Sequence, residues 1–265
     1  MLTASFRHIR GIGGMRERQL WMRGVSSWDG LPAGEILAPR LDALLRAGVE
    51  RSRERLAADD LDFFARALPE TEHWRLLPHL LEDVGFLDVE TAEDVTVIGV
   101  LDRDGPRSFL RGRDLDEFPA RAARWRGIVT FNGTAFDLPH LRRLFPSWNP
   151  PAAHVDLCVL LRRLGESGGL KDIEPRLGLH RPPHLLPLRA VDAVWLWRAQ
   201  REGDRTALRR LLEYNLHDAF HLRPIAEIAY NRMLRRSRMP AREIAVTERG
   251  ALLYDVSKAV ERALA

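Results

Sequence analysis

Acidic side chains stand where apolar segments of this chain end, and their spacing suits metal-dependent chemistry. Asp88 and Glu90 lie two residues apart at the end of an apolar, strand-like segment that begins at Val84. Side chains alternate along a strand, so both carboxylates emerge on the same face. Asp137 follows a second apolar segment, residues 127–133, and precedes a helical pattern. This position predicts an N-cap, and it is also a strand end of the kind where α/β sheets bind ligands.

A tyrosine and a further acid share one face of a predicted helix. Tyr214 and Asp218 are four residues apart in a helical pattern that begins after Asp204, and residues at this spacing are neighbours on a helix surface. They fall at the rim of the apolar stripe, where a core helix borders a cleft. Taken singly, each acid of the chain has an ordinary structural explanation, as an ion-pair partner, a cap or a solvated hydrogen-bonded group.

Together these elements supply four carboxylates, and four negative charges that converge on one place need cations to neutralise them. Oxygen-only ligands favour Mg²⁺ or Mn²⁺, and two divalent ions would balance the four charges. Two such ions stabilise the attacking and leaving oxygens in phosphoryl displacement. Asp88, Glu90, Asp137 and Asp218 therefore predict a site for two Mg²⁺ or Mn²⁺ ions at which phosphodiester bonds are hydrolysed.

The elements that must position these acids indicate an α/β fold. Three strand-like segments joined by tight turns are followed by a helix, a strand, a helix, a strand and then helices, and this order predicts a mixed sheet covered by helices. The predicted strands are residues 84–89, 95–101, 107–110, 127–133 and 154–159, and the first helices among them are 114–125 and 138–144.

Composition divides the chain into three parts. Residues 1–80 are rich in Arg and helix formers and predict a separate helical region, residues 81–232 hold the sheet, and residues 233–265 form a docked helix or a loosely held tail. The Gly-rich stretch 9–21 resembles half of a helix–hairpin–helix module, which would bind a phosphate through backbone N–H groups. An ordinary helix-opening turn explains that stretch equally well.

Three short motifs resemble those of a known superfamily. They are Phe-Leu-Asp-Val-Glu-Thr at residues 86–91, Phe-Asn-Gly-Thr-Ala-Phe-Asp at 131–137 and Tyr-Asn-Leu-His-Asp at 214–218. In order and context they resemble the motifs of the DEDD superfamily of ribonuclease-H-like 3′–5′ exonucleases, and most of all its YprB-like group. Segments 154–157 and 169–174 are similar as well, so the resemblance covers residues 84–230.

This resemblance implies a ribonuclease-H-like mixed five-stranded sheet flanked by helices. The superfamily has a histidine form and a tyrosine form, and here Glu213 stands in the histidine place, so the chain resembles the tyrosine form. A phenol with a pKa of about 10 is a poor base, so Tyr214 would orient the attacking water instead. The implied metal ligands are Asp88, Glu90, Asp137 and Asp218, which with Tyr214 make up the catalytic residues, and the implied substrate contacts are Asn132, Asp156 and Lys171.

The first motif departs from its relatives just after the acids. Similar proteins often continue it with Thr-Thr-Gly, whereas Thr91 here is followed by Ala92, Glu93 and Asp94. In similar enzymes that loop lies beside the substrate end, so the preferred substrate stays open.

The charge and cysteine content of the chain limit which partners and which cellular compartment can be expected. The 41 basic residues exceed the 37 acidic ones by four, and Lys171 and Lys258 are the only lysines. Arg suits phosphate contacts, although a GC-rich genome favours Arg equally. The lone Cys158 cannot form an internal disulfide, the N-terminus shows no apolar signal region, and the longest apolar run, near 155–161, is too short for a membrane span. We expect a cytoplasmic protein without a membrane role.

These features predict a hydrolase that acts on nucleic acid, namely a 3′–5′ exonuclease for single-stranded DNA or RNA. An alternative is a nucleic-acid-binding protein of the same fold without turnover, and a third is a partner-binding protein whose acids are ordinary caps and salt bridges. The choice between DNA and RNA, between cleavage at an end and within a strand, and the oligomeric state all stay open.

Overall fold

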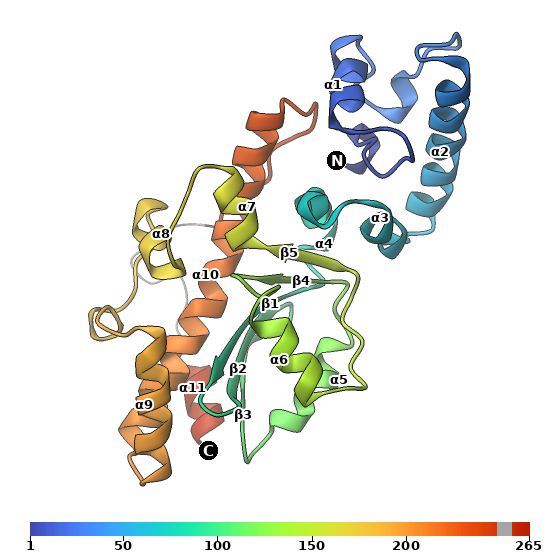
Figure 1. Cartoon of the computed structure of the whole chain (residues 1–265). Helices are drawn as coiled ribbons and strands as arrows, with labels where there is room; N and C mark the ends of the chain where they lie inside the picture. Colours follow the sequence, from blue (N-terminus) through green and yellow to red (C-terminus); the bar gives the residue numbers. More distant parts are fainter. Residues whose placement is uncertain (248–255) are drawn as a thin grey trace.

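The computed structural model describes residues 1–247 and 256–265 and contains a five-stranded mixed sheet (Figure 1). Its strands are β1 (Val84–Thr91), β2 (Val95–Asp102), β3 (Gly105–Leu110), β4 (Gly127–Thr130) and β5 (Ala153–Asp156), in the spatial order β3-β2-β1-β4-β5. β1, β2 and β3 are antiparallel neighbours, whereas β4 is parallel to both β1 and β5. The predicted mixed five-stranded sheet flanked by helices is confirmed.

Helices precede the sheet, interrupt it and follow it. Before β1 lie η1 (Leu2–Ala4), α1 (Gly14–Met22), η2 (Trp28–Gly30), α2 (Pro39–Ala57), α3 (Leu61–Ala67), η3 (Glu70–Leu76) and α4 (Leu77–Leu80). Between β3 and α7 lie η4 (Leu115–Glu117), α5 (Phe118–Ala122) and α6 (Asp137–Leu144). After β5 lie α7 (Leu157–Arg163), α8 (Leu170–Arg176), η5 (Pro183–Leu185), α9 (Ala190–Arg201), α10 (Arg205–Ser237) and α11 (Ser257–Leu264). The predicted helical N-terminal region is therefore present.

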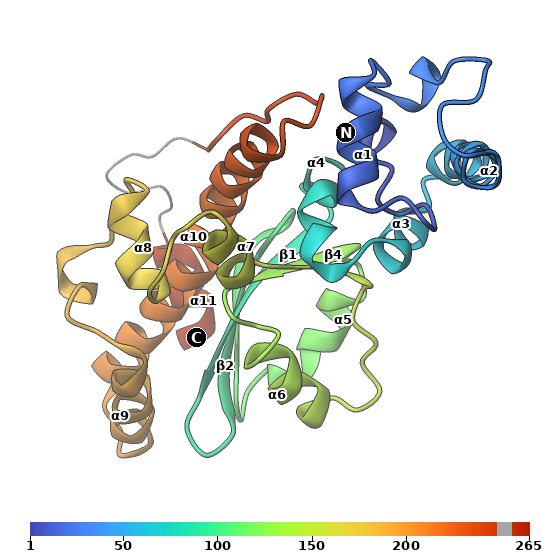
Figure 2. The same ribbon diagram turned by 45° about the horizontal axis from the view of Figure 1, so that its top comes forward.

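The two faces of the sheet bury separate apolar cores. Leu87 and Val89 of β1 pack with α5 and α6, whereas Phe86 packs with α10 and the N-terminal helices. Because strand side chains alternate, Asp88 and Glu90 fall on the α10 face. Figure 2 shows the corresponding layers, with α5 and α6 on one side of the sheet and α8 and α10 on the other.

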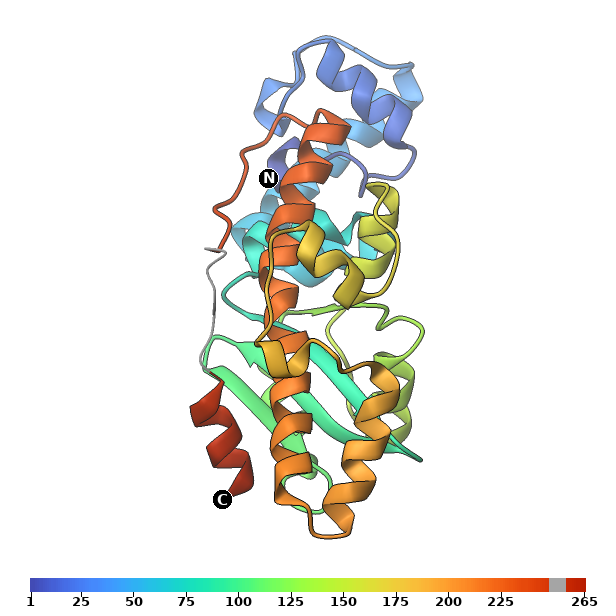
Figure 3. The ribbon, with the colours of Figure 1, turned by 90° about the vertical axis from the view of Figure 1, so that its left-hand side faces the viewer.

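α10 is the long helix that crosses the sheet. It starts where Asp204 accepts hydrogen bonds from the N–H groups of Thr206 and Ala207, as an N-cap does. Figure 3 shows α10 extending along the molecule with α9 beside its first half. Its first half approaches the sheet at Gly99, where an added methyl group would overlap Asn215. A glycine in the middle of β2 thus permits close packing of helix and sheet.

Three predicted elements differ in extent from those observed. The strand predicted for residues 127–133 ends at Thr130, because Asn132 takes a left-handed φ of 64°. The strand predicted for 154–159 ends at Asp156, whose carboxylate accepts the N–H of Cys158 and begins α7. The helix predicted for 114–125 is divided into η4 and the short α5, with a proline in the first turn of α5, where a missing N–H is tolerated.

The N-terminal helices share the core of the α10 face and enclose a buried ion cluster. The Arg75 guanidinium donates to Glu17 (2.8 and 2.9 Å) and to Glu72 (2.7 Å), and all three side chains are buried. Glu17 belongs to α1, whose N-cap is Gly13. In this structure the Gly-rich turn therefore opens a helix that supplies a buried anion.

The C-terminal part begins within α10, which continues past residue 232 to Ser237. The terminal α11 packs against β3 and α10. The rest of the predicted tail includes residues 248–255, which lie outside the described residues. Across the described parts of the chain, no helix combines the length and apolar character needed to cross a membrane.

Candidate active site

A cavity of about 810 Å³ opens at the carboxyl ends of β1 and β4, and residues of α6, α8, α9 and α10 line its walls. β1 and β4 are parallel, so both strands end at the same edge of the sheet, where α/β sheets commonly bind ligands. The cavity is lined by all five residues that the sequence predicts as catalytic: Asp88, Glu90, Asp137, Tyr214 and Asp218.

Three of the acids form one potential metal cage. One carboxylate oxygen from each of Asp88, Glu90 and Asp218 lies within 4.8 Å of the others. The β1 spacing turns the first two toward α10, and a register shift in the pairing with β2 lies next to Glu90. Such bulges re-aim side chains at strand ends. The donor set is composed of oxygen alone, which fits Mg²⁺ or Mn²⁺.

Asn215 fixes Asp88, although the sequence analysis assigned it no role. Its Nδ2 donates to the Asp88 carboxylate (2.7 Å) and to the Asp88 backbone oxygen (3.2 Å). The approach depends on Gly99, which pairs with Asp88 across the β1–β2 ladder. A glycine in an otherwise apolar strand was the available signal for this close contact.

Asp137 occupies the edge of the same group and is not the N-cap of α6. The N-cap position belongs to Phe136, and Asp137 is the first residue of the helix. Its Oδ1 accepts the N–H of Val89 (2.9 Å), so the side chain turns back to β1 instead of capping its own helix. Burial raises the pKa of its carboxyl to about 7 despite this hydrogen bond.

A buried network that the sequence analysis missed holds Asp218. Arg181 pairs with Asp218 Oδ1 and with Glu174. The Arg181 Nε donates to the Glu174 carboxylate at 2.6 Å. His221 Nδ1 lies 2.8 Å from Glu174. Glu174 belongs to α8 and to the similar segment 169–174, whereas Arg181 lies in the loop after α8, and no local pattern marks an ion pair of this kind.

Lys171 reaches into the acidic group from α8. Its Nζ contacts the Tyr214 hydroxyl and lies 3.3 Å from Asp218 Oδ2. The same ammonium lies 3.7 Å from the centroid of the Tyr214 ring. The predicted substrate contact at position 171 therefore lies within the acidic group itself.

The acidic group holds more negative charge than its own cations balance. Burial, then the charges of Asp218 and Glu90, raise the pKa of Asp88 well above its ordinary range. Burial and the Asp218 charge likewise raise the pKa of Glu90. Burial and the surrounding carboxylates raise the pKa of the Tyr214 phenol far above its usual value. This imbalance, together with the all-oxygen donor set, fits a site that binds divalent cations.

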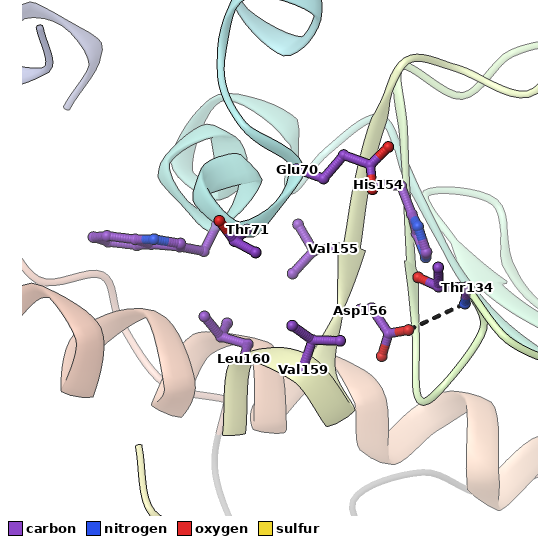
Figure 4. Close-up of a pocket in the computed structure, with 9 residues that line it drawn as sticks. Glu70, Thr71, Thr134, His154, Val155, Asp156, Val159 and Leu160 are labelled. Atoms are coloured by element: carbon purple, nitrogen blue, oxygen red, sulfur yellow. Dashed lines mark hydrogen bonds between the residues drawn. The ribbon is translucent and has the colours of Figure 1, made fainter. Parts of the chain in front are cut away.

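The other two predicted substrate contacts are joined by a hydrogen bond but line different pockets. Asn132 lines the large cavity, with its backbone N–H donating to Asp156 (2.9 Å). Asp156 lines a separate pocket of about 170 Å³ beside η3, and it also accepts the N–H groups of Thr134 and Cys158. Figure 4 shows the Asp156 carboxylate turned toward the backbone of Thr134. In the structure Asp156 thus fixes the loop after β4.

Aromatic and basic side chains surround the cavity above the acids. Phe131 and the exposed Phe136 line it from the loop after β4, and Phe136 packs on the His140 ring with a centroid distance of 4.6 Å. Arg162 of α7 and Arg189 before α9 line it as well. These groups add planar surfaces suited to stacking and cations suited to phosphate contacts to the cavity that holds the acids.

Comparison with known proteins gives one match. A family model for the RNase_H superfamily matches residues 85–230, which is more than half of the chain and includes every residue predicted as catalytic. The searches of curated proteins and of solved structures found no match.

Proposed function

The chain belongs to the RNase_H superfamily, and on this premise we propose that it is a metal-dependent 3′–5′ exonuclease acting on single-stranded DNA or RNA. The superfamily fold indicates nuclease-type hydrolysis of nucleic acid. The convergence of Asp88, Glu90 and Asp218 within one cavity is the observation that carries the proposal. The three motifs that resemble the tyrosine form of the DEDD superfamily, and its YprB-like group, support the finer assignment.

Asp88, Glu90 and Asp218 would hold one Mg²⁺ or Mn²⁺ ion, and Asp137 is available beside them for a second. When bound, such ions supply Lewis-acid stabilisation of the attacking and leaving oxygens. Arg181 keeps Asp218 in place, and Asn215 does the same for Asp88. Both ligands are therefore pre-oriented before substrate arrives.

Tyr214 would orient the attacking water through its hydroxyl group. Its raised pKa keeps the phenol protonated at neutral pH, so it donates or accepts a hydrogen bond and does not act as a general base. Its side chain is buried, with the hydroxyl directed to the acidic group through Lys171. The residue thus holds a water in one orientation without taking its proton.

The cavity suits the free end of a single strand. The acids lie at its buried base, with Glu90 only 8% exposed, while Arg162 and Phe136 stand nearer the opening. We expect a terminal nucleotide to reach these acids more easily than the stacked backbone of a continuous duplex. Arg162 and Arg189 would bind the phosphates, and Phe131 and Phe136 would stack on bases.

The test compares Asp88→Ala with the native protein on 5′-labelled single strands of DNA and RNA in Mn²⁺. We expect a ladder of products shortened from the 3′ end, and a loss of about 10³-fold in rate for the variant because a ligand to the ion is removed. Asp94→Ala is the matched control, since Asp94 is an exposed acid of the β1–β2 turn paired with Arg111. It should retain native activity.

A circular single strand separates end-directed from internal cleavage, because it offers no end. Its degradation would overturn the exonuclease assignment. Equal degradation by Asp88→Ala would assign the activity to a contaminant. Strand binding without cleavage in Mg²⁺ or Mn²⁺ would support the alternative, a nucleic-acid-binding protein with this fold.

A further inference from the structure

Two cations of the chain itself occupy the Asp218 carboxylate. Arg181 Nη2 pairs with Oδ1, and Lys171 Nζ lies 3.3 Å from Oδ2. A divalent ion that takes Asp218 as a ligand needs one of these two oxygens. Each carboxylate oxygen can accept more than one partner, but an ion bound there would lie close to both cations and be repelled by them, so we expect the more mobile of the two side chains to move away.

Arg181 cannot easily move. Its side chain is 3% exposed, and it is held by Glu174 through Nε (2.6 Å) and through Nη2. Glu174 is equally buried and also contacts His221. Withdrawing the guanidinium would leave a buried carboxylate without its counter-ion, which is strongly unfavourable. Arg181 therefore stays beside Asp218 Oδ1.

Lys171 has the freedom that Arg181 lacks. Its side chain is 17% exposed and lines the large cavity. It is the second residue of α8, which follows Gly168 and Gly169. A lysine carries a compact charge on a flexible four-carbon stem, so its ammonium can move into the cavity without any change in the backbone.

We propose that Lys171 is a displaceable counter-ion that pairs with Asp218 Oδ2 and leaves it when a divalent ion binds. This inference rests on the proposed function. The same movement releases the Tyr214 hydroxyl, which Lys171 also contacts. Metal binding would thus free both the ligand oxygen and the group that orients water. The displaced ammonium stays in the cavity, where a substrate phosphate can neutralise it.

The chain permits a direct test, because Lys171 and Lys258 are its only lysines. Protein labelled with ¹³C-lysine gives two sets of side-chain NMR signals. The ring of Tyr214 lies 3.7 Å from Lys171 Nζ, so its ring current should shift the Lys171 Cε protons upfield in chelator-treated protein. Titration with Mg²⁺ should move these signals toward the ordinary lysine position. The Lys258 signals should stay in place.

Calorimetry on the same sample establishes saturation with Mg²⁺. A Lys171 signal that stays upfield in protein saturated with Mg²⁺ would overturn the proposal that Lys171 is a displaceable counter-ion. This readout uses the unaltered protein and does not depend on nuclease activity.

A second test measures Mn²⁺ affinity after Lys171→Met, which keeps the side-chain length and removes the competing charge. We expect affinity to rise about tenfold, because the ion no longer displaces an ion pair. Lys258→Met is the control and should leave the affinity unchanged. Equal or weaker binding by Lys171→Met would overturn the inference alone. Failure of both the native protein and the variant to bind Mn²⁺ would overturn the proposed function as well.

Discussion

Two buried groups of acids in this molecule differ in how far the chain neutralises them. In the N-terminal region, Glu17 and Glu72 share the Arg75 guanidinium, and Glu72 also pairs with Arg163 at 2.9 Å. Burial alone would raise the pKa of Glu72, but the two guanidinium groups outweigh it and lower that pKa. The group is balanced, and it joins α1 to the helices before the sheet.

The cavity at the sheet edge lacks this balance. Among the residues that the structure describes, Lys171 and Arg181 are the lysine and arginine side chains in contact with its acids. The carboxylates around them are Asp88, Glu90, Asp137, Glu174 and Asp218. A protein that needed only stability could replace such acids at no loss, because uncompensated buried charge is unfavourable. Both groups are buried, so charge balance distinguishes them more than burial does, and this difference supports the proposed metal site.

Breaking the balanced group should produce the largest effect on folding. Arg75→Met removes the cation shared by two buried carboxylates, and we expect the free energy of unfolding to fall by about 3–5 kcal/mol in urea denaturation. Adding Glu17→Gln should recover part of that loss, since one stranded anion is then removed. The control is Arg66→Met, whose partner Asp62 is exposed, and it should change stability by less than about 0.5 kcal/mol. A small loss for Arg75→Met would contradict the role given to this group.

Replacing an acid of the cavity with a neutral residue should raise the free energy of unfolding instead of lowering it. The folded pKa of Asp137 is about 7, above the value of about 3.9 for an unfolded chain. As pH rises, the Asp137 carboxyl therefore loses its proton at a lower pH in the unfolded state than in the folded state. The free energy of unfolding declines as pH rises between these two pKa values. We expect the Asp137 carboxyl to contribute a loss of about 3 kcal/mol in the free energy of unfolding between pH 5 and pH 8 in chelator, in addition to the loss from the other buried acids, and Asp137→Asn should remove that contribution. Asn can still accept the Val89 N–H.

Denaturation of both proteins at the two pH values measures this difference. Parallel pH profiles would show that Asp137 is neutralised in some other way. Adding Mn²⁺ sharpens the comparison, because an ion that binds only the folded state stabilises it. That gain should be large for the native protein and small for Asp137→Asn.

The sequence predicted the parts of the site that depend on local geometry. Strand alternation places Asp88 and Glu90 on one face, and helical spacing places Tyr214 near Asp218. The order of the elements was enough to predict the mixed sheet. Each of these rules acts over a few residues, so one sequence is sufficient to apply it.

The missed parts depend on contacts between distant segments. Arg181 reaches Asp218 from a loop, and Asn215 reaches Asp88 because Gly99 leaves space for it. Asp137 faces β1 instead of capping its helix, since the Val89 N–H lies in reach. Hydrogen-bond partners of this kind are fixed by tertiary packing and leave no periodic pattern in the sequence.

The smallest predicted effect returns to the N-terminal region and gives it the opposite pH dependence to the cavity. His8 contacts Ser52 at 2.8 Å between the rings of Trp28 and Phe64. Burial, with a smaller effect of Arg75, lowers its pKa to about 4. An unfolded histidine takes up its proton near pH 6.5, so native stability falls as pH drops from about 6.5 toward 4.

Urea denaturation of the native protein and His8→Gln tests this effect. Between pH 7.5 and pH 5 the free energy of unfolding should fall by about 2 kcal/mol more in the native protein than in His8→Gln. An equal acid loss in both proteins would show that His8 accepts its proton without opening this region. The cavity acids weaken the fold as pH rises and His8 weakens it as pH falls, so the two variants should shift the pH of maximum stability in opposite directions.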